Sequence, residues 1–261
     1  MIFTGLLFGL NQIGQQPFWS WQVAGALIIG IVALILLIIR SQHLTNPMIN
    51  FQVFRQLQFS GYLGAFLIIQ LMTLGQSFIL PTYIQLVNQQ TAIVAGLAVL
   101  PGAVIAAALS PISGRILDKF GARRPILIGM SLIVLALLVF VLTSMQLTST
   151  RITLIGLLYM TGIGLGAGNV MTSALQSLPN DLQTNGNAVL TTLQQFAGAV
   201  GTSLVSTIIG QSQLAYSKTS LNISTAIGPQ RAFEALFILA IVALVLLIIV
   251  LRPKSKQPTS K

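Results

Sequence analysis

The chain has 261 residues, of which 54% are hydrophobic and only 6% carry a charge. Thirteen lysines and arginines stand against three acidic residues, and the mean hydropathy is +0.89. A soluble domain of this size needs a charged surface that so few residues do not provide. The absence of cysteine excludes disulfides and thiolate metal sites. The composition therefore indicates a protein that crosses the membrane several times.

The first predicted element covers residues 1–10, which we interpret as the outer end of a membrane helix whose beginning is missing. This stretch lacks the basic residues and the small-residue cleavage site of a signal peptide. Phe18, Trp19 and Trp21 follow it, and aromatic residues gather at membrane–water interfaces. We therefore expect one partial helix before the first full span.

Seven full membrane spans are predicted after the partial helix. Each is a largely apolar stretch of roughly 20 residues, the length at which a helix crosses a bilayer. Lipid offers backbone groups no hydrogen-bond partner, and no stretch alternates as a barrel strand does. The predicted fold class is therefore an all-α polytopic membrane protein. The spans are 22–40, 59–86, 92–113, 125–146, 152–178, 186–210 and 232–251.

The basic residues assign the two sides of the membrane, because cytoplasmic loops carry an excess of lysine and arginine. Ten basic residues fall on one side and only Arg151, Lys218 and Arg231 on the other, which places the C-terminus in the cytoplasm of a plasma-membrane protein. They stand at helix ends without interleaved aromatic residues, so we expect contact with the lipid bilayer and none with nucleic acid. The cytoplasmic set is Arg40, Arg55, Arg115, Lys119, Arg123, Arg124, Arg252, Lys254, Lys256 and Lys261.

The six spans from residue 59 onward form two triplets of similar character. The first two spans of each triplet carry polar and small residues, while the third is almost purely aliphatic. Polar and small faces contact other helices or a water-filled cavity, and aliphatic helices face lipid. The first triplet starts inside and the second outside. We therefore predict inverted repeats at 59–146 and 152–251, a design found in transporters.

Polar residues in these spans recur on single helix faces. Asn169, Ser173 and Gln176 follow helical spacing, for example. Each polar residue alone is explained by an interhelical hydrogen bond, but the faces together favour a shared cavity. The predicted lining residues are Gln70, Gln76, Tyr83, Asn169, Gln176, Gln194 and Gln195.

The glycine run GIGLGAG at 162–168 lies within a predicted span. A dinucleotide loop needs a preceding strand and a nearby downstream acid, and neither is present, so we reject that interpretation. The glycines form two offset frames, 162/166 and 164/168. We expect these frames to let two neighbouring helices approach closely.

The stretch GRILDKFGARRP at 114–125 carries five charged residues in a chain that is nearly free of charge. Basic residues in a cytoplasmic loop act as topology signals. That role does not account for Asp118 or for the glycines at 114 and 121.

Several motifs resemble the Major Facilitator Superfamily, in particular the 14-span drug:proton antiporters of the EmrB/QacA type. The loop matches that family's signature Gly-x-x-x-Asp-(Arg/Lys)-x-Gly, and similar segments are LPTYIQ (80–85), AGLAVLPGA (95–103), SPISGRILDKFG (110–121) and GNAVLTTLQQFAGAVGTS (186–203). The resemblance implies two central linker helices in 1–40, the first of them partial, and a cytoplasmic connection over 41–58. Residues 59–251 then form the C-terminal six-helix half, and 252–261 a basic cytoplasmic tail.

The resemblance also implies a role for the loop as a conformational latch. Its aspartate is expected to cap a neighbouring helix and to pair with basic residues, and such contacts must break during transport. The expected latch residues are Gly114, Arg115, Asp118, Lys119, Gly121, Arg123 and Arg124.

No carboxylate is expected in the middle of a span. Asp118 and Asp181 are assigned to cytoplasmic connections, Glu234 to an outer helix end beside Arg231, and the single His43 to a loop. Proton relays need an intramembrane acid or histidine, so this chain alone is not expected to couple transport to protons. It is either a fragment or a natural half that joins a missing N-terminal half or a second copy.

The predicted function is therefore part of a multidrug efflux permease. It would export lipophilic compounds by alternating access driven by the proton gradient, without a cofactor or metal. The alternative is an assembly subunit or a channel-like homodimer without proton coupling. An enzyme is not expected, because no nucleophile motif, metal-ligand motif or pair of acids converges on one site.

Overall fold

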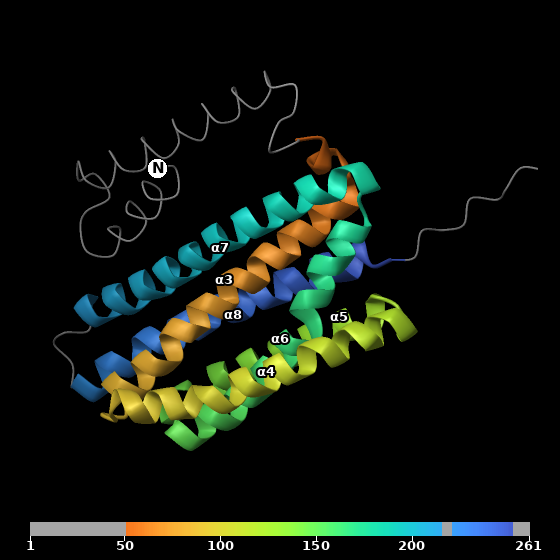
Figure 1. Ribbon diagram of the computed structural model, residues 1–261. Helices are drawn as coiled ribbons and strands as arrows, with labels where there is room; N and C mark the ends of the chain where they lie inside the picture. The colour runs from red at the N-terminus through yellow and green to blue at the C-terminus, as the bar shows by residue number, and fades with distance from the viewer. Residues whose placement is uncertain (1–50, 216–220, 253–261) are drawn as a thin grey trace, which may run out of the picture.

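The computed structural model describes residues 51–215 and 221–252, so the predicted partial helix and the span 22–40 lie outside the described residues. Helices make up nearly all of this part of the chain, and no strand occurs in it (Figure 1). The elements are η1 (Phe51–Arg55), α3 (Leu57–Leu86), α4 (Ala92–Phe120), α5 (Arg123–Thr143), η2 (Ser144–Gln146), α6 (Ser149–Gln176), α7 (Asn180–Ala215) and α8 (Leu221–Val250).

Five described segments are long and apolar enough to cross a membrane: Leu57–Leu86, Ala92–Phe120, Arg123–Gln146, Ser149–Gln176 and Ile227–Val250. They confirm an all-α polytopic membrane fold. The span predicted at 186–210 lies within α7, which has 36 residues and is about 54 Å long. It is long enough to cross, but its amides and hydroxyls make it less apolar than the other five.

The charged stretch that was predicted as a loop is mostly helical. α4 continues to Phe120 rather than ending at residue 113, so only Gly121 and Ala122 connect it to α5. Gly121 has a φ of 76°, which glycine adopts without steric strain. Its N–H donates to the carbonyl of Leu117 at 2.8 Å and closes the end of α4. The charged residues therefore sit on two helix ends that meet at a tight turn.

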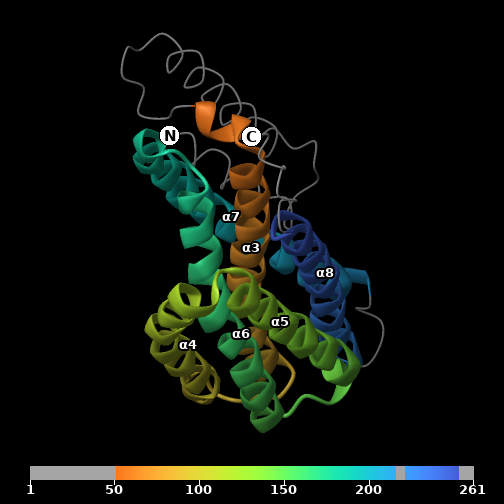
Figure 2. The same ribbon diagram turned by 90° about the vertical axis from the view of Figure 1, so that its right-hand side faces the viewer.

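The helices pack as two groups of three, which Figure 2 shows in a view roughly along the helix axes. In one group α3 lies between α7 and α8, and in the other α6 lies between α4 and α5. The two groups meet where α3 contacts α6 and where α5 contacts α8. Each group therefore combines the first helix of one predicted triplet with the second and third helices of the other.

Burial differs strongly between α3 and α4. Half of the most apolar stretch of α3 is buried within the bundle, against 11% of that stretch in α4. α4 contacts α6 along a face that includes Gly102 and Ser113, and it makes smaller contacts with α3 and α5. α4 is thus more exposed than α5 in the described part of the chain.

Glycines bring α6 into backbone contact with both of its neighbours. A Cβ on Gly129 of α5 would lie 2.7 Å from the carbonyl oxygen of Gly162 and 2.8 Å from the nitrogen of Gly166. On the other side, a Cβ on Gly164 would lie 2.9 Å from the carbonyl oxygen of Ala106 in α4. The close approach of two neighbours predicted from the glycine run is therefore confirmed. Gly168 takes no part in it, since a Cβ there meets nothing within 4 Å.

Candidate functional site

The seven predicted lining residues divide into an accessible set and a buried set. Gln70 and Gln194 are half-buried, and Gln176 and Gln195 are exposed. The other three lie in the interior: Gln76 is 0% exposed, Tyr83 1% and Asn169 4%. The structure therefore brings only the four accessible residues to a surface where a solute can reach them directly.

Two of the buried residues form hydrogen bonds between elements. The hydroxyl of Tyr83 donates to the carbonyl of Ser144 at 2.8 Å and ties α3 to η2. The amide of Asn169 donates to the hydroxyl oxygen of Ser113 at 2.6 Å and to the carbonyl of Leu165 at 2.9 Å, which ties α6 to α4. Both side chains use their polar atoms in packing. In contrast, neither amide atom of Gln76 has a hydrogen-bond partner.

Three of the four accessible lining residues, all but Gln194, belong to polar stripes on three helices. Each stripe follows helical spacing of three or four residues, and each presents amides or hydroxyls beside aliphatic or small side chains. Such a surface forms hydrogen bonds but offers no fixed charge to a solute. The stripes are Gln70, Leu74 and Ser77 on α3; Gly168, Thr172 and Gln176 on α6; and Asn187, Thr191 and Gln195 on α7.

Four polar members of these stripes were not among the predicted lining residues: Ser77, Thr172, Asn187 and Thr191. The signal that identifies them is the spacing itself, because each lies three or four residues from a glutamine in the accessible set or from another stripe member. The sequence placed polar residues on common helix faces, but which of those faces is exposed depends on how the helices pack. A face-based selection would have found them.

A cavity of about 300 Å³ lies away from these stripes, between the N-terminal turns of α4 and α6. Three hydroxyl-bearing residues of α6 form one wall and aliphatic residues of both helices the other. None of the seven predicted lining residues contributes to it. Its lining is Val94, Leu97, Ala98, Ser149, Thr150, Thr153 and Leu154.

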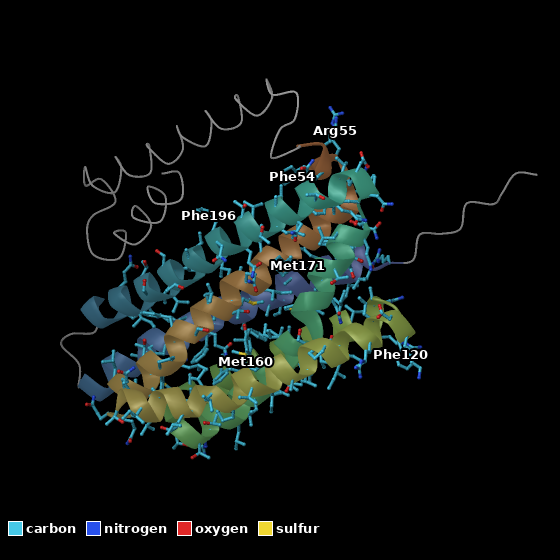
Figure 3. All side chains as sticks on the ribbon, in the orientation of Figure 1. Phe54, Arg55, Phe120, Met160, Met171 and Phe196 are labelled. Carbon is cyan, nitrogen blue, oxygen red and sulfur yellow. The ribbon has the colours of Figure 1, made fainter. Side chains whose placement is uncertain are left out.

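The predicted latch residues lie together at the meeting point of α4 and α5. Gly114 is half-buried, and the other six predicted members, Arg115, Asp118, Lys119, Gly121, Arg123 and Arg124, are exposed. The Nζ atom of Lys119 lies 5.4 Å and the Cζ atom of Arg124 lies 5.8 Å from the ring centroid of Phe120, within the range of cation–π attraction. Phe120 and Arg55 stand at the same end of the bundle (Figure 3).

Asp118 has no ion pair or hydrogen bond within residues 51–215 and 221–252. Asp118 also does not cap the N-terminus of α5. That helix follows Ala122 and has no side-chain cap. Glu234 accepts a hydrogen bond from Gln230 at 3.3 Å near the start of the apolar part of α8. In the described part of the chain, no three acidic or histidine side chains come together as a metal site would require.

Comparison with known proteins gives a consistent family assignment. The family model described as Major Facilitator Superfamily matches residues 1–202. The lincomycin resistance protein LmrB of Listeria innocua is 32% identical over 90% of this chain and 49% of its own length. LmrB of Bacillus subtilis is 31% identical over 93% of this chain and 53% of its own length. The multidrug resistance protein Stp of Mycobacterium tuberculosis is 24% identical over 63% of this chain and 30% of its own length.

The chain thus spans about half the length of the LmrB relatives that it matches. The matched region covers the glycines of α6 that contact α4 and α5, the charged α4–α5 turn and most of α7. The helical membrane fold and the family match together show that the chain belongs to the Major Facilitator Superfamily.

Proposed function

We propose that the chain is part of a multidrug efflux permease that exports lipophilic compounds from the cell across the plasma membrane. The observation that carries this proposal is the set of uncharged polar stripes on α3, α6 and α7 in a chain similar to LmrB. A surface of amides, hydroxyls and aliphatic groups suits bulky apolar compounds that carry a few hydrogen-bonding groups. The accessible residues Gln70, Gln176, Gln194 and Gln195 would contact such compounds. On this proposal the chain acts as a transporter and not as an enzyme.

We propose further that the function requires a second helical unit, either an N-terminal half or a second copy of this chain. α4 exposes Ile93, Leu97, Leu100 and Val104 along one face, and only a helical partner or lipid can cover so apolar a surface. The unpaired Asp118 also needs a partner outside the described residues if it acts as a latch. Proton-coupling acids would lie in that second unit, because no carboxylate occupies the middle of a described span.

A chimera tests the proposal directly. This chain replaces the matching half of Listeria innocua LmrB, and the product is expressed in a bacterium without its own drug pumps. We expect ethidium or lincomycin export that stops when a protonophore collapses the proton gradient. Export by a chimera that carries Gln176→Leu and Gln195→Leu should fall at least about tenfold, as the loss of one or two buried hydrogen bonds predicts. Correct insertion without any export would overturn the proposal.

The latch is tested in the same chimera. Asp118→Asn keeps the shape of the side chain and removes its charge. We expect slower export with unchanged amounts of protein in the membrane, whereas Arg55→Gln, a charge change of equal size and opposite sign at the same end of the bundle, should have little effect. Equal export by the Asp118 variant and the parent chimera would remove Asp118 from the mechanism.

The alternative of a channel-like homodimer rests on the open face of α4. Gly96 meets nothing within 4 Å, and Ala103 and Ala107 are exposed on the same face, so a second copy can approach closely there. This alternative predicts ion conductance by the purified chain in a planar bilayer. The efflux proposal predicts none.

A further inference from the structure

The contact between α3 and α6 contains buried polar groups that have no protein partner. Both amide atoms of Gln76 and the hydroxyl of Tyr159 lack a hydrogen bond, although both residues are 0% exposed. Native proteins rarely leave such groups unpaired, because a lost hydrogen bond with water is not replaced. Elsewhere in the same bundle, Tyr83 and Asn169 show the usual outcome, with direct hydrogen bonds to neighbouring elements.

The two unpaired side chains face the same contact. The hydroxyl of Tyr159 faces the side chain of Thr73 on α3 as its nearest polar partner, but the pair lacks the geometry of a formed hydrogen bond. About two turns further along α3, Leu80 meets the position where a Cβ on Gly156 of α6 would stand. Gln76 follows Thr73 by three residues and precedes Leu80 by four, so it lies on the same α3 face. From this spacing we infer that the Gln76 amide reaches the α3–α6 contact.

Thr73 cannot supply all the hydrogen bonds that Gln76 and Tyr159 lack. Its hydroxyl donates to the carbonyl of Ile69 at 2.7 Å, so its oxygen remains only as an acceptor. Tyr159 can donate to that oxygen, and its own oxygen then needs a donor. Gln76 brings two donors and one acceptor. A small molecule that both donates and accepts would satisfy the remaining groups.

The charge of the surroundings selects a neutral ligand. The acidic residues of the chain are Asp118, Asp181 and Glu234, and all three are exposed, whereas Gln76 is fully buried. A cation bound here would have no counter-charge in an apolar interior, where the loss of hydration is costly. Water needs two to four polar partners, and the three side chains supply them.

We propose that the α3–α6 contact is an internal hydration site, in which a water molecule bridges the amide of Gln76 and the hydroxyl of Tyr159. This site joins the two helix groups. It differs from the α5–α6 contact, where backbone meets backbone at Gly129 and Gly162. A hydrated contact lets α3 and α6 shift while their polar groups stay bonded, because water can follow the movement. The inference goes beyond drug export and does not depend on it.

Hydroxyl-radical footprinting by X-ray radiolysis tests the proposal on the full chain in lipid nanodiscs. Radicals form at bound water, so buried residues beside water are oxidised. Tyr83 is the matched control for Tyr159, since both are fully buried tyrosines. We expect Tyr159 to be oxidised at least several-fold faster than Tyr83, whose hydroxyl is bonded directly to Ser144. Equal rates would overturn the proposal.

Apolar substitution gives a second and independent test. If water bridges the site, Gln76→Met and Tyr159→Phe should each lower the apparent melting temperature by about 3 °C, and the double variant by no more than the larger single effect. A dry site predicts the opposite for Gln76→Met, since removing unpaired polar atoms leaves stability unchanged or higher. Gln70→Met, on the accessible face of the same helix, is the matched control and should change little. Neither test uses transport, so failure of the export proposal leaves this result intact.

Discussion

The two helix groups share a plan but differ in how their central helices are held. α6 contacts α5 through Gly129, Gly162 and Gly166 and contacts α4 through Gly164, so backbone meets backbone on both sides. α3 has one such contact, where a Cβ on Gly201 of α7 would overlap the carbonyl of Leu71. Its contact with α8 is made by side chains. The comparison indicates a rigid group around α6 and a more adaptable group around α3.

The two groups are joined by stacked aromatic side chains and by buried polar side chains. Phe140 of α5 stacks on Phe233 of α8 with ring centroids 4.7 Å apart and planes 1° from parallel. Aromatic faces in contact can slide with less loss than interlocked backbones. The α3–α6 contact adds the polar residues Thr73, Gln76 and Tyr159. Movement between the groups is therefore less hindered than movement within the α6 group.

The largest expected effect comes from Gly129→Ala in the α6 group. The new Cβ would lie 2.7 Å from a backbone oxygen, and neither helix can yield without losing its other contact. We expect a loss of about 3 kcal/mol in the free energy of unfolding, the upper range for overpacking. Thermal denaturation in detergent measures it. Gly168→Ala is the control and should cause no loss, because a Cβ there meets nothing within 4 Å. A similar loss for both would contradict the comparison.

Asn169→Ala removes the Asn169 side of the polar tie between α6 and α4 and leaves the bond from Ser113 to Leu165 in place. The substitution deletes two hydrogen bonds, to Ser113 and to Leu165, from a buried site. We expect a loss of about 2 kcal/mol, since the buried hydroxyl oxygen of Ser113 loses its donor while its own bond to the carbonyl of Leu165 remains. Gln176→Ala, on the exposed face of the same helix, should stay within about 0.5 kcal/mol of the parent. If the two variants unfold at the same temperature, the tie contributes nothing.

Tyr83→Phe removes the corresponding tie in the α3 group and should cost less. One hydrogen bond of 2.8 Å to the carbonyl of Ser144 is lost, for which about 1 kcal/mol is expected. Amide hydrogen exchange should accelerate around η2, where the bond is made. Thr143→Val is the control, because its hydroxyl bonds only to Val139 in its own helix. Faster exchange in both variants would show that the long-range tie is not the cause.

Gly198→Ala should have the smallest effect and would sharpen the contrast with Gly129. The new Cβ would overlap only the end of the Leu74 side chain, which is 42% exposed and free to turn away. Alanine also favours a helix over glycine by about 1 kcal/mol. We therefore expect a net change within about 0.5 kcal/mol of zero, measured as for Gly129→Ala. A large loss would show that the α3 group is as rigid as the α6 group.

Much of the fold follows from local sequence. Apolar stretches of membrane-spanning length locate α3, α4, α5, α6 and α8 because length and hydropathy are properties of each segment alone. The glycine run of α6 predicted close neighbours for the same reason. The end of α4 was predicted too early, because charged residues at 115, 118 and 119 resemble a loop in composition. Those residues instead continue α4 as far as Phe120.

The candidate site was less predictable from sequence than the fold. Gln70 and Gln76 are equally polar and lie on one helix, yet one is half-buried and the other has no exposed surface. Their difference arises from the rotation of α3 against its neighbours. Rotation depends on side chains of three other helices, and no pattern within residues 57–86 contains that information.

The sequence by itself determined that this protein is a bundle of membrane helices with a charged stretch at 114–125, because those features depend on composition and spacing along one segment. Tertiary structure alone decided which glycines touch, and that Asn169 and Tyr83 bond to neighbouring elements while Gln76 remains unpaired among the described residues. The physical reason is that contact and burial are set by how helices rotate and cross, and packing between distant segments fixes both.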